Sequence, residues 1–95
     1  MKILITAGPT YEPIDEVRRL TNFSTGRLGI ELGNYFRDQG HEVLSLCGEL
    51  VSYAGLNRAQ HTIRFSTTSH LDGLIRGCGR DFAPDAVFHA AAVSD

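Results

Sequence analysis

The sequence has few of several residue types, and each shortage narrows the kinds of protein it can encode. Cys47 and Cys78 are the only cysteines of the 95 residues, so there is no second pair for a metal site or a disulfide framework. Nine basic residues stand against eleven acidic ones, a net charge of -2. Without a basic excess, we expect neither non-specific nucleic-acid binding nor binding to a membrane surface.

Long apolar runs are also missing, which bears on where the protein works. No run approaches the length of a membrane span, and residues 1–5 are too short for a secretory signal peptide. Four histidines show no ligand spacing, and the two cysteines have no oxidising context. These absences favour a cytoplasmic protein with reduced thiols.

Strand-like and helix-like patterns alternate along the chain. Short apolar, β-branched runs predict strands, and apolar residues at helical spacing predict two helices between them. The predicted strands cover residues 2–6, 42–47, 62–65 and 86–93. The helices are expected at about 25–39, and from a cap at Thr67 or Thr68 to Gly77 and Gly79.

Each predicted helix has one apolar face. In the first, that face carries Leu28, Leu32, Tyr35 and Phe36, with Ser24 or Thr25 as N-cap and Gly40 in the left-handed position just past the end. Gly29 and Gly33, one turn apart, would let this helix lie close against a sheet. In the second, the face carries Leu71, Leu74, Ile75 and Cys78.

This alternation predicts a single α/β domain over residues 1–95, Rossmann-like, with three α/β/α layers and a parallel sheet. The expected strand order is 3-2-1-4, and the sheet is expected to be incomplete at its C-terminal end. The near-continuous apolar run at residues 86–93 is typical of a strand covered on both faces.

Residues 7–24 are the most unusual part of the pattern. Such a connection normally takes two to six residues, and Pro9 and Pro13 forbid helix in its first half. Long loops of this kind are usually functional. In the expected order, the loop and the chain after residue 93 face one crevice at the carboxyl ends of neighbouring strands, where ligands bind in such sheets.

The start of the first helix has the chemistry of an anion site. Ser24, Gly26 and Gly29 surround backbone N–H groups at the positive end of the helix dipole. Asn22 is open to two interpretations, a hydrogen-bond partner for a carboxylate or a turn residue. Asp95 would contact a base or ribose, or cap a further helix. Neither a dinucleotide fingerprint, a Walker A loop nor a Ser-His-Asp set is present.

Two stretches resemble the phosphopantothenoylcysteine synthetase family, also called phosphopantothenate–cysteine ligases. The first is ILITAGPTYEPID at residues 3–15 with VR at 17–18 and TNFSTGRLG at 21–29; the second is AAAVSD at 90–95. The resemblance spans the whole chain. It identifies residues 1–95 as the amino-terminal nucleotide- and substrate-binding part of such a ligase domain, which in many bacteria follows a flavin-dependent decarboxylase.

The resemblance implies a two-step ligation in coenzyme A biosynthesis. The carboxylate of 4′-phosphopantothenate attacks the α-phosphate of CTP (ATP in other members) with Mg²⁺, and the amino group of cysteine then attacks the acyl-nucleotide. Asn22 and Arg18 are the implied catalytic residues. The implied nucleotide-binding residues are Gly8, Ser24, Gly26, Gly29, Ala91 and Asp95, and no protein-bound metal site is implied.

The family also uses a lysine-rich motif that follows the second stretch, and Lys2 is the only lysine of this chain. The family's ligase domain is about twice as long and forms a homodimer. We therefore expect these 95 residues to bind nucleotide weakly and to be inactive alone.

Two other functions remain open at this stage. Residues 84–92 also resemble the Asp-x-Val-x-His-x-Ala-Ala stretch of extended short-chain dehydrogenases and epimerases, which bind NAD(P). A non-catalytic nucleotide-binding module is the third possibility.

Overall fold

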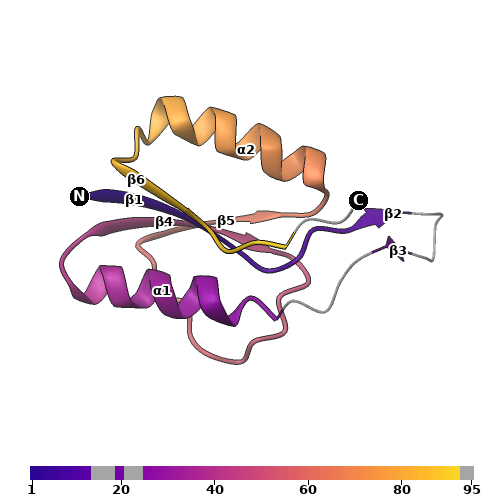
Figure 1. Cartoon of the computed structure of the whole chain (residues 1–95), viewed down its shortest axis with the longest axis horizontal. Coiled ribbons are helices and arrows are strands. Elements are labelled where there is room, and N and C mark those ends of the chain that lie inside the picture. Colours follow the sequence, from indigo (N-terminus) through magenta and orange to yellow (C-terminus); the bar gives the residue numbers. More distant parts are fainter. Residues whose placement is uncertain (14–18, 21–24, 93–95) are drawn as a thin grey trace.

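The core of the fold is a four-stranded parallel sheet flanked by two helices (Figure 1). The computed structural model describes residues 1–13, 19–20 and 25–92. The sheet has the order β5-β4-β1-β6, which confirms the predicted 3-2-1-4 arrangement. Its strands are β1 (Lys2–Ala7), β4 (Glu42–Gly48), β5 (His61–Phe65) and β6 (Ala86–His89).

The two faces of the sheet carry separate apolar clusters because successive residues of a strand point to opposite sides. Leu4, Leu44, Leu46 and Phe65 form one cluster, which helix α2 (Thr68–Asp81) covers with Leu71. Ile3, Ile5 and Val43 form the cluster on the other face, where α1 (Arg27–Asp38) packs with Leu32 and Phe36. The predicted three-layer α/β/α architecture is therefore present.

Helix α1 differs from the sequence prediction at its start and in its packed face. It begins at Arg27, with Gly26 as N-cap at φ 86° and no side-chain cap, rather than with Thr25. Leu28 is 68% exposed, whereas Gly29, Ile30 and Gly33 are buried. The predicted apolar face is wrong in this respect, because the glycine face approaches the sheet more closely than a leucine face can.

Helix α2 begins as predicted and ends later. The Thr67 hydroxyl accepts a hydrogen bond from the backbone N–H of His70, which is a standard N-cap. The helix then continues through Gly77 and Gly79 to Asp81, so these glycines do not end it. Cys78 and Phe82 pack against the core cluster on this face and hold the last turn in place.

Strand β6 is shorter and less buried than expected. It ends at His89, and Val87 and Phe88 are 45% and 37% exposed, so the prediction of a strand covered on both faces is wrong. In the described part of the chain, β6 has β1 as its only neighbour. An edge strand has fewer packing partners than a central one.

The long connection after β1 is not structureless throughout. It contains an antiparallel pair, β2 (Glu12–Pro13) and β3 (Arg19–Leu20), which the sequence did not predict. Tyr11 anchors its first part, donating its backbone N–H to Ser66 O at 3.0 Å. The carboxylate of Glu12 accepts a hydrogen bond from the backbone N–H of Thr68 at 3.1 Å, at the start of α2.

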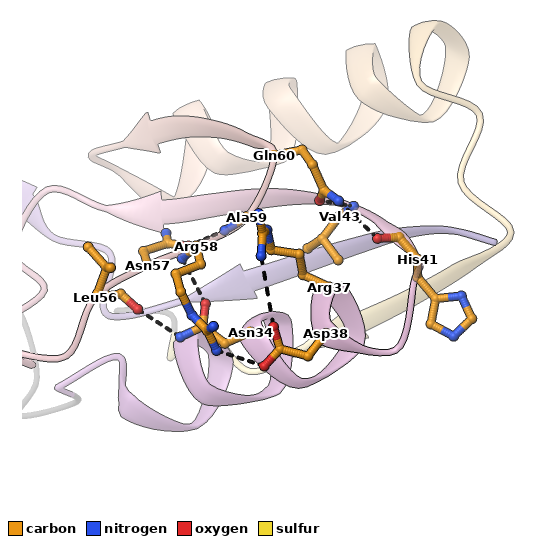
Figure 2. Close-up of polar contacts among 10 residues, drawn as sticks. All are labelled: Asn34, Arg37, Asp38, His41, Val43, Leu56, Asn57, Arg58, Ala59 and Gln60. Carbon is orange, nitrogen blue, oxygen red and sulfur yellow. Dashed lines mark hydrogen bonds and ion pairs between the residues drawn. The ribbon is translucent and has the colours of Figure 1, made fainter.

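The connection between β4 and β5 runs alongside α1 as an extended segment, residues 49–60, here called the strap (Figure 2). The side chain of Asn34 in α1 donates to Leu56 O and accepts from the backbone N–H of Arg58, both at 2.7 Å. Arg58 pairs with Asp38 at 2.8 Å. The Gln60 amide accepts from Val43 N at 2.9 Å and donates to His41 O at 3.1 Å, so side chains hold the strap in place.

Candidate functional site

The two sequence motifs meet at the carboxyl edge of the sheet, as the strand order predicted. Beyond β1 and β6, the chains remain side by side: Thr10 N donates to Ala92 O and Ala92 N donates to Gly8 O, both at 3.0 Å. Pro9 and Ala92 form a parallel bridge. The loop after β1 and the start of the second motif therefore line the same edge.

Gly8 and Gly26 form the centre of this edge, here called the glycine cradle. Both have left-handed backbones, with φ of 88° and 86°, which favour glycine over any residue with a side chain. A Cβ on Gly26 would lie 3.5 Å from Gly8 Cα. The fold thus brings together two glycines that are separated by the long connection.

Val51 of the strap covers the cradle. A Cβ on Gly8 would come within 2.3 Å of Val51 Cγ2, and one on Gly26 within 2.8 Å of the same methyl group. Tyr53 holds this part of the strap in place, because its backbone N–H donates to Thr25 O at 3.0 Å. Sequence reasoning missed Val51 and Tyr53, since nothing in the 49–60 pattern pairs them with the glycines.

Helix α1 approaches the sheet edge closely at Gly29. A Cβ there would lie 2.5 Å from Ala7 Cβ and 2.8 Å from Thr6 O, so no larger residue fits without a shift. The N–H groups of Leu28 and Gly29 have no acceptor within the described residues, whereas Ile30 N donates to Gly26 O. Unbonded N–H groups at the positive end of a helix dipole form an anion-binding arrangement.

A charged chain of contacts borders the start of α1. The Glu31 carboxylate accepts hydrogen bonds from Tyr53 Oη at 2.9 Å and from Arg27 Nε at 3.1 Å. These bonds, Tyr53 first, lower the pKa of Glu31, and the same contact with the carboxylate raises the pKa of the Tyr53 phenol. The side chain of Arg27 is therefore paired with Glu31.

Of the predicted site residues, the structure places four. Gly8, Gly26 and Gly29 lie together at the start of α1. Ala91 lies at the same edge of the sheet, where its N–H donates to Thr6 Oγ1 at 3.1 Å, but its side chain packs on the α2 side of the sheet. The other four predictions fall outside the described residues: Arg18, Asn22, Ser24 and Asp95.

Metal and membrane sites find no support in the described chain. Among residues 1–13, 19–20 and 25–92, no three His, Cys, Asp or Glu side chains gather as metal ligands. Over the same residues, neither helix has the length and apolar character needed to cross a bilayer.

A parallel sheet with the order β5-β4-β1-β6, helices on both faces and a glycine-lined helix start at its carboxyl edge defines the class of Rossmann-like α/β proteins. Within it, the chain belongs to the family described as DFP, the DNA/pantothenate metabolism flavoprotein C-terminal domain, whose model matches residues 1–95. The family match assigns the motif at residues 84–92 to this family rather than to the dehydrogenases.

Individual relatives of the chain support the same family assignment. The chain is 33% identical over 93 residues to the coenzyme A biosynthesis bifunctional protein CoaBC of Vibrio parahaemolyticus, covering 98% of this chain and 22% of that protein. The DNA/pantothenate metabolism flavoprotein of Streptococcus pneumoniae superposes with a TM-score of 0.83 at 34% identity, over 100% of this chain and 41% of that one.

Two further solved structures share the fold. The C-terminal domain of CoaBC has a TM-score of 0.81 at 33% identity, over 99% of this chain and 46% of that one. A Cab2 mutant in complex with phosphopantothenate-cysteine has a TM-score of 0.74 at 19% identity, over 99% and 46% of the two chains, and so shows a common fold alone. The present chain thus spans less than half of each solved relative.

Proposed function

We propose that the chain provides the nucleotide- and phosphopantothenate-binding part of a phosphopantothenate–cysteine ligase in coenzyme A biosynthesis. The observation that carries this proposal is the junction of Gly8 and Gly26 at the start of α1, beside the chain that follows β6. Family membership supports the same reaction, since the relatives include proteins named for coenzyme A biosynthesis.

The proposed reaction joins the carboxylate of 4′-phosphopantothenate to the amine of cysteine in two steps. A carboxylate oxygen of 4′-phosphopantothenate attacks the α-phosphorus of CTP, and pyrophosphate leaves. The amine of cysteine then attacks the acyl carbon of the acyl-cytidylate and forms the C–N bond, CMP leaves with the pair of electrons of the broken C–O bond, and the amide nitrogen loses a proton to solvent. Neither step needs a covalent bond to the protein, so positioning and charge neutralisation supply the catalysis.

The described residues fit the phosphate part of this scheme. The N–H groups of Leu28 and Gly29 would donate to triphosphate oxygens, and the helix dipole would stabilise their negative charge. Glycines at 8 and 26 allow a phosphate to approach the backbone, provided that Val51 moves aside. Mg²⁺ would enter with the triphosphate, since the described residues offer no cluster of metal ligands.

The remaining roles follow the resemblance of the motifs. Asn22 and Arg18 would hold the phosphopantothenate carboxylate and the acyl intermediate. Ser24 would add a hydroxyl to the phosphate site, and Ala91 and Asp95 would contact the nucleotide. The whole protein would work in the cytoplasm as a homodimer, joined in some members to a flavin-dependent decarboxylase.

Lys2 is not placed to neutralise the triphosphate. It lies at the start of β1, about 20 Å along the strand from Gly8 at a rise of about 3.3 Å per residue. Its ammonium group lies 3.3 Å from Phe82 O and 5.4 Å from the centre of the Phe82 ring. A lysine acting on the nucleotide would have to come from elsewhere, so we expect no turnover by these residues alone.

Nucleotide binding tests the proposal directly. In calorimetric titrations with Mg²⁺ present, we expect CTP to bind, and Gly26→Ala to weaken binding by about tenfold or more through its strained backbone and the contact with Val51. Gly73→Ala is the matched control, since a Cβ there meets nothing within 4 Å. Circular dichroism checks that both variants fold.

One outcome would overturn the proposal, and a second would overturn only the expectation that these residues are inactive alone. Binding of NADP⁺ without binding of CTP or ATP would contradict the ligase site. Release of CMP and pyrophosphate by this chain alone, with phosphopantothenate, CTP and cysteine, would contradict the need for further residues.

A further inference from the structure

A cavity of about 510 Å³ lies beneath the strap, separate from the glycine cradle. Cys47 of β4 and Thr62 and Arg64 of β5 line it from the sheet, and Ile30 lines it from α1. The strap supplies the remaining lining residues, which are Val51, Tyr53, Ala54, Gly55, Leu56 and Asn57. Its volume falls within the range of small-molecule sites.

The cavity exists because an extended segment occupies the place of a helix. Parallel strands are usually connected by a helix that packs its side chains onto the sheet. The strap is instead tied to α1 through Asn34 and to β4 through Asn57, whose amide donates to Ser45 Oγ at 3.3 Å. The strap is therefore fixed at both sides while Ala54 and Gly55 leave the space beneath it unfilled.

The cavity carries a positive charge without a counter-charge. Arg64 is exposed and has no carboxylate partner among the described residues, while Glu31, which bonds to Tyr53 of the lining, is also paired with Arg27. The guanidinium of Arg64 also acts on the neighbouring Cys47, where it opposes the rise in pKa that burial imposes on the thiol. An anion in the cavity would meet this charge directly.

The cavity lining contains both polar and apolar residues. Thr62 and Asn57 line it together with Arg64, and Ile30, Val51 and Leu56 are its apolar members. Such a combination suits a molecule that has both an acidic group and an apolar or aromatic body.

We propose that this cavity is a second ligand site, which binds a small organic phosphate or carboxylate with its acidic group at Arg64 and its body beneath the strap. The site does not depend on the ligase reaction. It shares one residue with the cradle, because Val51 lines the cavity and also contacts Gly8 and Gly26. An occupant would therefore affect how Val51 covers the cradle.

Phenyl phosphate and benzoate are suitable probes, and benzyl alcohol is their neutral counterpart. In ¹H–¹⁵N correlation spectra of the chain, we expect one or both anions to shift the amide signals of residues 51–57, 62 and 64, with benzyl alcohol binding at least about tenfold more weakly. The comparison between the two anions shows which acidic group the site prefers.

Separate substitutions then test the charge of Arg64 and the free volume of the cavity. Arg64→Gln should weaken anion binding by about tenfold, whereas the exposed Arg80→Gln on α2 should leave it unchanged. Thr62→Trp should block binding by filling the cavity, and its amide spectrum shows whether it folds.

The two cysteines provide an independent measurement. Cys47 lines the cavity and is buried, so iodoacetamide reaches it only when the strap opens, whereas Cys78 lies on the opposite face of the sheet. A bound anion should therefore slow labelling of Cys47 alone, as followed by mass spectrometry at long reaction times. Shifts confined to Gly8, Gly26 and Gly29 would place the anions in the cradle and overturn the proposal. Equal effects of Arg64→Gln and Arg80→Gln, or no binding of either anion, would also overturn it, and CTP binding would remain a separate result.

Discussion

The side-chain oxygen of Asn34 accepts a hydrogen bond from the backbone N–H of Arg58, 24 residues further along the chain (Figure 2). The same amide donates to Leu56 O, so one side chain bonds to the strap as a neighbouring strand would. Because the strap also carries Val51 and Tyr53, this tether connects the middle of α1 with the glycine cradle at its start.

Removal of this tether should destabilise the protein. Asn34→Ala leaves Arg58 N–H and Leu56 O without their partner, which should lower the free energy of unfolding by about 2 kcal/mol in urea titrations. Gln39→Ala is the control, since Gln39 is exposed and makes no side-chain hydrogen bond among the described residues. Equal stability of the two variants would show that the strap does not depend on Asn34.

Two glycine-to-alanine substitutions should change the free energy of unfolding in opposite directions. Gly29→Ala forces a Cβ to 2.5 Å from Ala7 Cβ, and we expect a loss of about 1–3 kcal/mol in unfolding free energy. Gly73→Ala lies in open space on α2 and should gain about 0.5–1 kcal/mol from helix propensity. Thermal and urea unfolding measure both, and a neutral Gly29→Ala would contradict the close approach of α1 to β1.

The Glu31 carboxyl should titrate below its ordinary range. Its hydrogen bonds from Tyr53 and Arg27 lower its pKa in the folded state. The resulting stability is present above the ordinary carboxyl pKa of the unfolded chain and is lost as pH falls through the lowered folded value. Carboxyl ¹³C titration by NMR measures the midpoint directly.

Tyr53→Phe should move that midpoint upward, because the largest of the stabilising bonds is lost. Tyr35→Phe is the control, since Tyr35 lies one helical turn from Glu31 and is 58% exposed, but it makes no hydrogen bond to that carboxylate. An unchanged Glu31 midpoint in Tyr53→Phe would mean that the phenol does not bond to this carboxylate in solution.

The exposed edge strand β6 should promote self-association. Val87 is 45% exposed on a strand with one neighbour in the described sheet, and open edges with apolar side chains pair readily with other chains. Val87→Lys should reduce concentration-dependent association in sedimentation experiments, with a stability change below about 0.5 kcal/mol. Leu28→Lys, an exposed helical position, should leave association unchanged.

The strand order could be predicted because local patterns were strong. The strands have short apolar runs with clear ends, and right-handed crossovers then leave few topologies. The approach of Gly29 to the sheet and the left-handed Gly40 were also expected from the sequence, and the structure has both. The end of α2 could not be predicted from the sequence, because the contacts of Cys78 and Phe82 with the core outweigh the low helix propensity of Gly77 and Gly79.

The candidate site was predictable only in part. Gly8, Gly26 and Gly29 could be singled out because they lie in the loop and at the helix start, where glycine allows a left-handed backbone or a close approach to the sheet. Val51, by contrast, is an ordinary apolar residue whose importance depends on where the strap lies. Asn34 and Gln60 act through long-range hydrogen bonds, and no periodic pattern reveals such partners.

The amide of Gln60 has a consequence for strand alignment. It bonds to His41 O and Val43 N, immediately before the ladder in which Leu44 pairs with His61. A slip of one residue would turn every β5 side chain to the opposite face of the sheet. Arg64 would then enter the apolar cluster beneath α2 and Phe65 would lie under the strap, so a single side-chain amide helps to decide which layer of the protein receives the charge.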